Sequence, residues 1–247
     1  MDTPSLSHWT CAVPKEGAGA GDYEDAAALD GDDWPVCAAV ADGATESVFA
    51  QRWARRLVRG LTEQAVTSAE AFGDGVRDWQ SEWQAHATER AADRPWYVAA
   101  KAAEGAFATV LGLSLQSGGA WRAVSVGDCC LFHVRDGALV QSWPVASPDA
   151  FTNRPALVPS RTDRAVPTPE TAGGSWQPTD RFVLATDAGA SWLLRDGLDL
   201  LRGGPEAVQD RVQAARADGA LRNDDVTLLV LDLASVPEAN GNASTGS

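Results

Sequence analysis

The sequence has little positive charge for its length. Its 247 residues include 20 Lys and Arg against 34 Asp and Glu, which gives a formal net charge of −14 and a pI near 4.5. An acidic surface repels the phosphates of nucleic acids and the headgroups of anionic membranes. We therefore expect no nucleic-acid partner and no membrane partner, whereas the acidic charge is compatible with the binding of divalent cations.

Histidine and cysteine are also scarce. There are three His and four Cys, and none of the cysteines forms a CxxC pair. Because zinc sites need such spacings, we expect no zinc site and interpret the thiols as small buried hydrophobes in a reducing compartment. No apolar run approaches the ~20 residues of a membrane helix, and the first ten residues lack a basic-then-apolar signal. A cytoplasmic location is expected.

Hydrophobic residues make up 45% of the chain, enough for a real core. The spacing of Phe49, Trp53, Leu57 and Leu61 predicts an amphipathic helix. Two more helices are predicted, at about 69–91 and from Pro95 into Phe107. Helices are also expected after RFVLATD and over PEAVQDRVQAARADG. β-Branched and apolar runs predict strands at 9–13, 26–29, 34–41, 107–116, 120–137, 138–145, 181–187 and 224–233.

Strands and helices are segregated along the chain rather than alternating. This order predicts an α+β fold, with two antiparallel sheets packed together and helices outside (an α-β-β-α sandwich). We expect one domain over residues 1–234 and a disordered tail at 235–247. Residues 146–177 are rich in Pro, Ser, Thr and Gly and are expected to form an irregular flap.

Aspartates recur where the predicted apolar strands begin or end. They are Asp42 after PVCAAVA, Asp128 after AVSVG, Asp187 after RFVLAT and Asp224 before DVTLLVLDL, with Glu24 and Asp25 opening another strand. Taken singly, each has an ordinary alternative as a helix cap, a turn residue or a solvated loop charge. Unpaired buried carboxylates are costly, so convergence of these ends would require a cation. Oxygen ligands alone select hard ions such as Mg²⁺ or Mn²⁺.

Six short motifs occur in an order that resembles the type-2C metal-dependent protein Ser/Thr phosphatases, the PPM family, in a divergent bacterial-type form. They are YEDA, VADGATES, GAFATVLGLSL, VGDCCLFHVRDG, FVLATDAG and NDDVTLLVLDL, and the resemblance covers the chain from about Trp9 to Leu233. The resemblance implies the same double-sheet sandwich and a phosphoric monoester hydrolase that acts on phosphoserine or phosphothreonine of proteins.

The resemblance also implies roles for individual residues. Asp42 would bridge two Mg²⁺ or Mn²⁺ ions, with the Gly43 carbonyl as a further ligand. Asp187 and Asp224 would bind the first ion, Glu24 and Asp25 would hold waters around the second, and Asp128 would bind a weaker third. Asp42, Asp187 and Asp224 would thus carry catalysis, in which a hydroxide that bridges two ions attacks the phosphate ester.

The chain departs from the family in the residues that handle phosphate. The Arg that many members carry five residues before the acidic Asp is Ala20, and Ala44 stands where animal enzymes place a His. Lys15 and Arg154 are candidate substitutes for the missing Arg, with a solvated surface charge as the alternative for each.

The function predicted from the sequence is a metal-dependent phosphatase of a phosphorylated protein, the product of a Ser/Thr kinase. Two alternatives stay open. One is a non-catalytic phosphatase-like binding or regulatory module, which the missing Arg favours. The other is a phosphatase of a small phosphorylated metabolite, which the altered flap allows.

Overall fold

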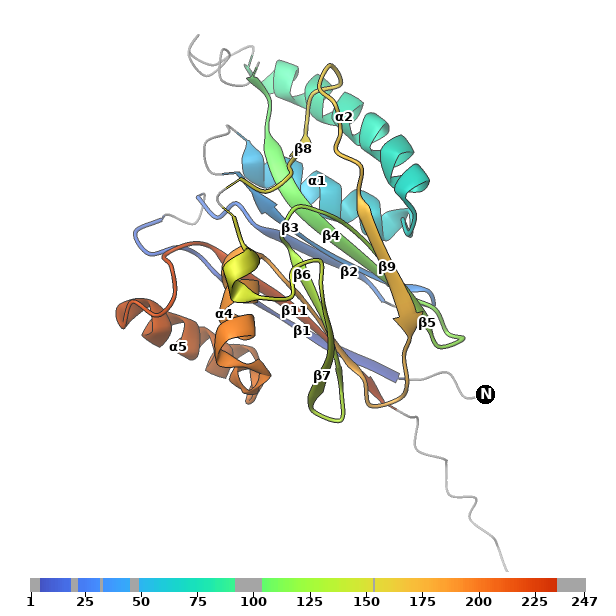
Figure 1. Ribbon diagram of the computed structural model, residues 1–247. Helices are drawn as coiled ribbons and strands as arrows, with labels where there is room; N and C mark the ends of the chain where they lie inside the picture. The colour runs from blue at the N-terminus through green and yellow to red at the C-terminus, as the bar shows by residue number, and fades with distance from the viewer. Residues whose placement is uncertain are drawn as a thin grey trace, which may run out of the picture.

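The protein is described by a computed structural model over residues 5–18, 22–31, 33–44, 49–91, 104–152 and 154–234, with the side chains of 87–91 excepted. Two antiparallel sheets lie face to face, as Figure 1 shows. The first sheet contains, in spatial order, β1 (Ser5–Val13), β11 (Val226–Ala234), β10 (Arg181–Ala185), β6 (Cys130–Arg135) and β7 (Ala138–Trp143). The second contains β2 (Ala26–Asp30), β3 (Val36–Gly43), β4 (Phe107–Leu115), β5 (Ala120–Val126) and β9 (Glu170–Ser175), and β8 (Val158–Pro159) pairs with β4.

Helices cover the outer faces of both sheets (Figure 1). Helices α1 (Ala50–Glu63) and α2 (Ala69–Ala91) lie on the second sheet, and α4 (Asp187–Asp196) and α5 (Gly204–Ala217) lie on the first. Short 3₁₀ turns are present at η1 (Pro148–Ala150) and η2 (Leu198–Leu201). The predicted α+β sandwich is therefore confirmed. No helix within the described ranges is long and apolar enough to cross a membrane.

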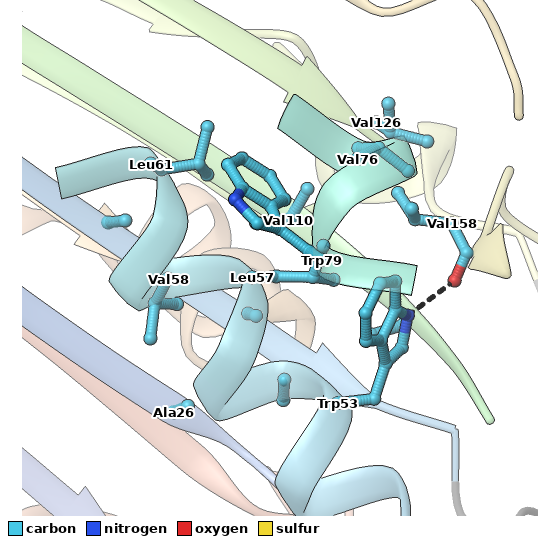
Figure 2. Close-up of a cluster of buried hydrophobic side chains, with 14 of the residues drawn as sticks. Ala26, Trp53, Leu57, Val58, Leu61, Val76, Trp79, Val110, Val126 and Val158 are labelled. Atoms are coloured by element: carbon cyan, nitrogen blue, oxygen red, sulfur yellow. Dashed lines mark hydrogen bonds between the residues drawn. The ribbon is translucent and has the colours of Figure 1, made fainter. Parts of the chain in front are cut away.

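The core consists of three apolar layers. Leu111, Phe182 and Leu229 belong to the layer between the sheets, and the other two layers lie under the two helix pairs. Figure 2 shows the layer under α1 and α2, where the Trp53 indole donates from Nε1 to the Val158 carbonyl over 2.8 Å. Trp53, Leu57 and Leu61 are buried there as the four-residue spacing predicts.

Two expectations about chain segments need revision. The predicted helix from Pro95 lies mostly in residues 92–103, outside the described part of the chain. Its expected end is wrong, because Gly105 has φ +86 and Phe107 opens β4. The expected flap at 146–177 includes β9, which pairs with β5 from Ala120↔Ser175 to Ser125↔Glu170. The tail at 235–247 also lies outside the described residues.

Candidate metal centre

One end of the sandwich brings together the predicted acidic residues of both sheets. In the second sheet, β2 begins at Ala26, which pairs with Ala41 of β3, so Asp25 and Asp42 share that end. In the first sheet, β10 ends at Ala185 opposite Leu228 and Cys130. Asp187, Asp224 and Asp128 flank these three strands at the same end. The strand register thus brings Asp25, Asp42, Asp128, Asp187 and Asp224 to the same end of the sandwich.

Hydrogen bonds of Asp25 join the two sheets at this end. The hydroxyls of Thr186 and Thr227 both donate to its Oδ2, over 2.8 Å and 2.7 Å. The Tyr23 hydroxyl is hydrogen-bonded to Thr227 Oγ1. Burial raises the pKa of Asp25 to about 7 despite the two threonine bonds, which lower it, and the charges of Asp225 and Asp187 raise it further.

Asp42 lies within the electric field of four other aspartates. Burial raises the pKa of Asp42 well above its ordinary value, and the charges of Asp25, Asp187, Asp224 and Asp128 raise it further. Asp42 is thus the member of the cluster on which the charges of the four other aspartates act together.

Asp128 is the one cluster member with an orphaned atom. It is 7% exposed, and its Oδ1 is buried without a hydrogen-bond partner in the described part of the structure. Burial raises the pKa of Asp128 to about 6, with a further contribution from the Asp187 charge. An orphaned buried carboxylate oxygen is expected to bind a cation or a water.

Gly43 is required by close packing behind Asp42. A Cβ added to Gly43 would lie 2.8 Å from the Glu24 carbonyl oxygen and 3.0 Å from Ala50 of α1. Only glycine lets the acidic motif, β3 and the start of α1 approach so closely.

Asp187 and Asp224 are held as a pair by an arginine. Arg222 Nη2 donates to Asp187 Oδ2 and to Asp224 Oδ2, each over 2.6 Å. Burial raises the pKa of Asp187, and the Arg222 charge opposes that rise.

Asp225 fixes the acidic loop although the sequence assigned it no role. Its two oxygens accept from the Lys15 backbone N–H over 2.8 Å and from the Glu24 N–H over 2.7 Å. Thr186, Thr227 and Arg222 were also missed. Each lies within three residues of a predicted ligand, and that proximity is the only sequence signal that marks them.

Lys15 lies beside the acidic cluster, and Arg154 lies in the exposed loop before β8. Lys15 Nζ pairs with Glu24 Oε2 at 3.2 Å. Partial burial lowers the Lys15 pKa, but the Glu24 hydrogen bond and the charges of Glu24, Asp225 and Asp224 raise it above its ordinary value. The Arg154 side chain forms no ion pair with any carboxylate of the described residues.

A groove of about 540 Å³ opens next to Glu24. It is lined by Lys15, Glu16, Gly17, Ala18, Asp22, Glu24, Phe49 and the first residues of α1, from Ala50 to Arg52. Lys15 therefore lies both in this groove and against the acidic cluster.

The donor set suits a hard divalent cation in its chemistry. The converging groups are carboxylates, and the unpartnered Asp128 Oδ1 supplies a buried acceptor. Nevertheless, no three His, Cys, Asp or Glu side chains within the described residues surround a common point as metal ligands do. The ligand chemistry fits, and binding would require side chains to move.

Comparisons with known proteins identify the family and agree with the fold. The family described as protein phosphatase 2C matches residues 22–223, and the chain therefore belongs to the protein phosphatase 2C family. No curated protein sequence matches the chain.

Solved structures of this fold resemble the chain over nearly its whole length at low identity. The catalytic domain of PstP in complex with two manganese ions is 17% identical, with a TM-score of 0.63, covering 94% of this chain and 100% of that one. The Mycobacterium tuberculosis serine/threonine phosphatase PstP/Ppp is 18% identical, with a TM-score of 0.62 and coverage of 93% and 99%. RsbX in complex with magnesium is 16% identical, with a TM-score of 0.56 and coverage of 95% and 98%.

Proposed function

We propose that this chain is a metal-dependent phosphatase that hydrolyses phosphoserine or phosphothreonine in proteins. The observation that carries the proposal is the convergence of Asp25, Asp42 and Asp187, with Asp128 and Asp224, at one end of the sandwich. A protein that keeps five mutually repelling carboxylates together pays in stability, and a cation is the simplest compensation.

The chain's own residues have separate tasks in this proposal. Asp42, Asp187 and Asp224 would hold Mg²⁺ or Mn²⁺, with Gly43 offering its carbonyl and Glu24, Asp25 and Asp128 completing the acidic surroundings. Bound ions would supply charge neutralisation and an acidified water. Thr186 and Thr227 orient Asp25, and Asp225 fixes the loop that carries Lys15 and Glu24 by accepting from their backbone N–H groups.

The substrate is proposed to approach through the groove beside Glu24. The groove is open and its walls are mostly polar and charged, which suits a phosphorylated peptide segment. Lys15 in that wall is the better candidate for the phosphate, because Arg154 has no described contact with the cluster. Lys15→Gln should raise the KM for a phosphopeptide, whereas Arg154→Gln should leave it unchanged. An unchanged KM in Lys15→Gln would remove Lys15 from the proposal.

The decisive experiment is Mn²⁺-dependent hydrolysis of an aryl phosphate by wild type and Asp42→Asn. The matched control is Asp196→Asn, which changes an exposed aspartate that pairs with its neighbour Arg195 on α4. We expect turnover in wild type and in the control and none in Asp42→Asn. Equal turnover in all three would refute the proposed site. A phosphopeptide and a phosphorylated metabolite, compared by kcat/KM, then distinguish protein from small-molecule substrates.

The alternative of a non-catalytic phosphatase-like module has one specific observation in its favour. Asp187 and Asp224 are already bridged by Arg222. A folded protein that binds Mn²⁺ yet hydrolyses no phosphate ester would support that alternative.

A further inference from the structure

Arg222 donates hydrogen bonds to the carboxylates of two proposed metal ligands. A single nitrogen, Nη2, donates to Oδ2 of both Asp187 and Asp224 over 2.6 Å. The other oxygen of each carboxylate accepts from a neighbouring backbone N–H, from Ala188 over 2.6 Å and from Asp225 over 3.0 Å. All four oxygens of the pair therefore already accept a hydrogen bond.

We propose that Arg222 is an internal counter-cation that competes with a divalent ion for the Asp187–Asp224 pair and so sets the metal affinity of the site. The inference rests on the proposed function for the assignment of these two carboxylates as ligands. Its direct basis is that one cationic nitrogen donates to both oxygens and so occupies the acceptors that a bound cation would need.

Arg222 and a bound ion exclude one another on physical grounds. Mg²⁺ binds carboxylate oxygens at about 2.0–2.1 Å, so an ion on these two oxygens would repel a guanidinium nitrogen held 2.6 Å from each. The guanidinium cannot escape by losing its proton, because arginine stays charged in proteins. Binding therefore requires the side chain to leave.

The surrounding structure allows Arg222 to leave without moving the backbone of Asp224. Its side chain is 59% exposed, so the released guanidinium would be hydrated at once. A second arginine, Arg216, holds the loop from behind. It is 8% exposed, and its guanidinium donates to the backbone carbonyls of Val13, Pro14 and Asp224. The backbone of Asp224 is thus anchored independently of Arg222.

Charge balance makes the exchange favourable at sufficient ion concentration. Arg222 supplies one positive charge to a pair that carries two negative charges, and a divalent ion supplies two.

The test is calorimetric titration of Mn²⁺ into wild type, Arg222→Gln, Arg222→Lys and the control Arg195→Gln at one pH. Arg195 pairs with exposed Asp196 on the helix that begins at Asp187, so its loss should not affect the site. Removing the competitor should tighten Mn²⁺ binding roughly fivefold in Arg222→Gln, the upper range for an exposed ion pair. Arg222→Lys keeps the charge and should stay near wild type.

Each outcome bears on the inference. Tighter binding only in Arg222→Gln supports it, and so does measurable binding that appears only in that variant. Unchanged or weaker binding in Arg222→Gln overturns it, as does the absence of Mn²⁺ binding in every variant. If affinity changes as expected but no variant hydrolyses a phosphate ester, the proposed function fails and the inference stands. Hydrolysis by wild type with unaltered affinity in Arg222→Gln refutes the inference alone.

Discussion

Asp180 and Asp25 are both almost completely buried, at opposite ends of the same sandwich. Asp180 precedes β10 and accepts hydrogen bonds from Arg135 Nε over 2.7 Å and from the Gln177 N–H over 2.9 Å, with His133 Nε2 2.7 Å away. Burial raises the pKa of Asp180, but the Arg135 and His133 interactions and the Gln177 bond outweigh it and lower the pKa to about 2. At the other end, burial raises the pKa of Asp25 to about 7.

Burial alone therefore does not assign a role to an acidic side chain. Asp180 is surrounded by cationic and backbone donors and has become part of the scaffold. Asp25 receives only neutral hydroxyls and faces other carboxylates, so its charged form is unfavourable until something neutralises the cluster. A pKa raised by burial and by neighbouring carboxylates, like that of Asp25, is typical of functional sites.

Asp42→Asn should cause the largest loss of activity. It should also make the metal-free protein more stable. Removing the Asp42 charge should lower Mn²⁺-dependent kcat/KM by at least about 100-fold, since even outer-shell changes at metal sites cost 10–100-fold. The metal-free protein should melt at a higher temperature, because one repelling carboxylate is gone. Aryl phosphate kinetics and thermal melts in EDTA measure the two effects. A lower melting temperature in EDTA would contradict this account of the acidic end.

Asp180→Ala, at the other end, should strongly destabilise the protein and leave metal binding unchanged. Leaving His133 and Arg135 without their acceptor should lower the free energy of unfolding by about 3–5 kcal/mol, the usual result of breaking a buried pair. The exposed pair provides the control, since Asp196→Ala should cost at most about 1 kcal/mol. Urea denaturation measures both. Mn²⁺ affinity should be unchanged in folded Asp180→Ala, and altered affinity would mean that the two ends are coupled.

The two ends should also respond to pH in opposite directions. Without metal, folded Asp25 and Asp128 hold protons to pH of about 7 and about 6, whereas unfolded aspartate loses them near pH 4. Stability at this end therefore falls as pH rises from about 4 to about 7. Asp180 contributes stability that is present above about pH 4 and is lost as pH falls toward its folded pKa of about 2.

Thermal melts across this range, with EDTA and with saturating Mn²⁺, test the contrast. In EDTA the melting temperature should fall from mildly acidic to neutral buffer, and Mn²⁺ should abolish that fall. Asp180→Ala should lose only the fall in melting temperature toward acidic pH. If the melting temperature still falls toward neutral pH in saturating Mn²⁺, the aspartate cluster is not the cause of that fall.

Much of the fold could be predicted because the signals are local. The four-residue spacing of Trp53, Leu57 and Leu61 is sufficient to specify the buried face of α1. Strand β9 was missed because its sequence, ETAGGS, has little strand propensity. Its Gly174 is required by a distant side chain, since a Cβ there would meet the Trp121 indole nitrogen at 2.8 Å.

The candidate site was predictable only where it follows strand ends. An aspartate that ends an apolar strand, such as Asp42 or Asp187, is conspicuous in the sequence. The partners that determine its chemistry are not, because Thr227 reaches Asp25 across 202 positions and Arg135 reaches Asp180 across 45. Hydrogen bonds between residues so far apart in the sequence produce no local periodicity or motif spacing that could predict them.

Arg222→Gln and Arg135→Gln provide the finest test of the comparison, since each removes an arginine from a carboxylate at one end. In EDTA both should be destabilised: Arg222→Gln by up to about 1 kcal/mol as a half-exposed pair, and Arg135→Gln by about 1–3 kcal/mol because it hydrogen-bonds fully buried Asp180. Saturating Mn²⁺ should cancel the loss in Arg222→Gln, because the ion replaces the missing cation. It should leave the loss in Arg135→Gln untouched, because the pair at Asp180 has no exchangeable partner. Urea melts with and without Mn²⁺ measure this difference, and equal rescue of both variants would erase the distinction between a structural and a replaceable counter-ion.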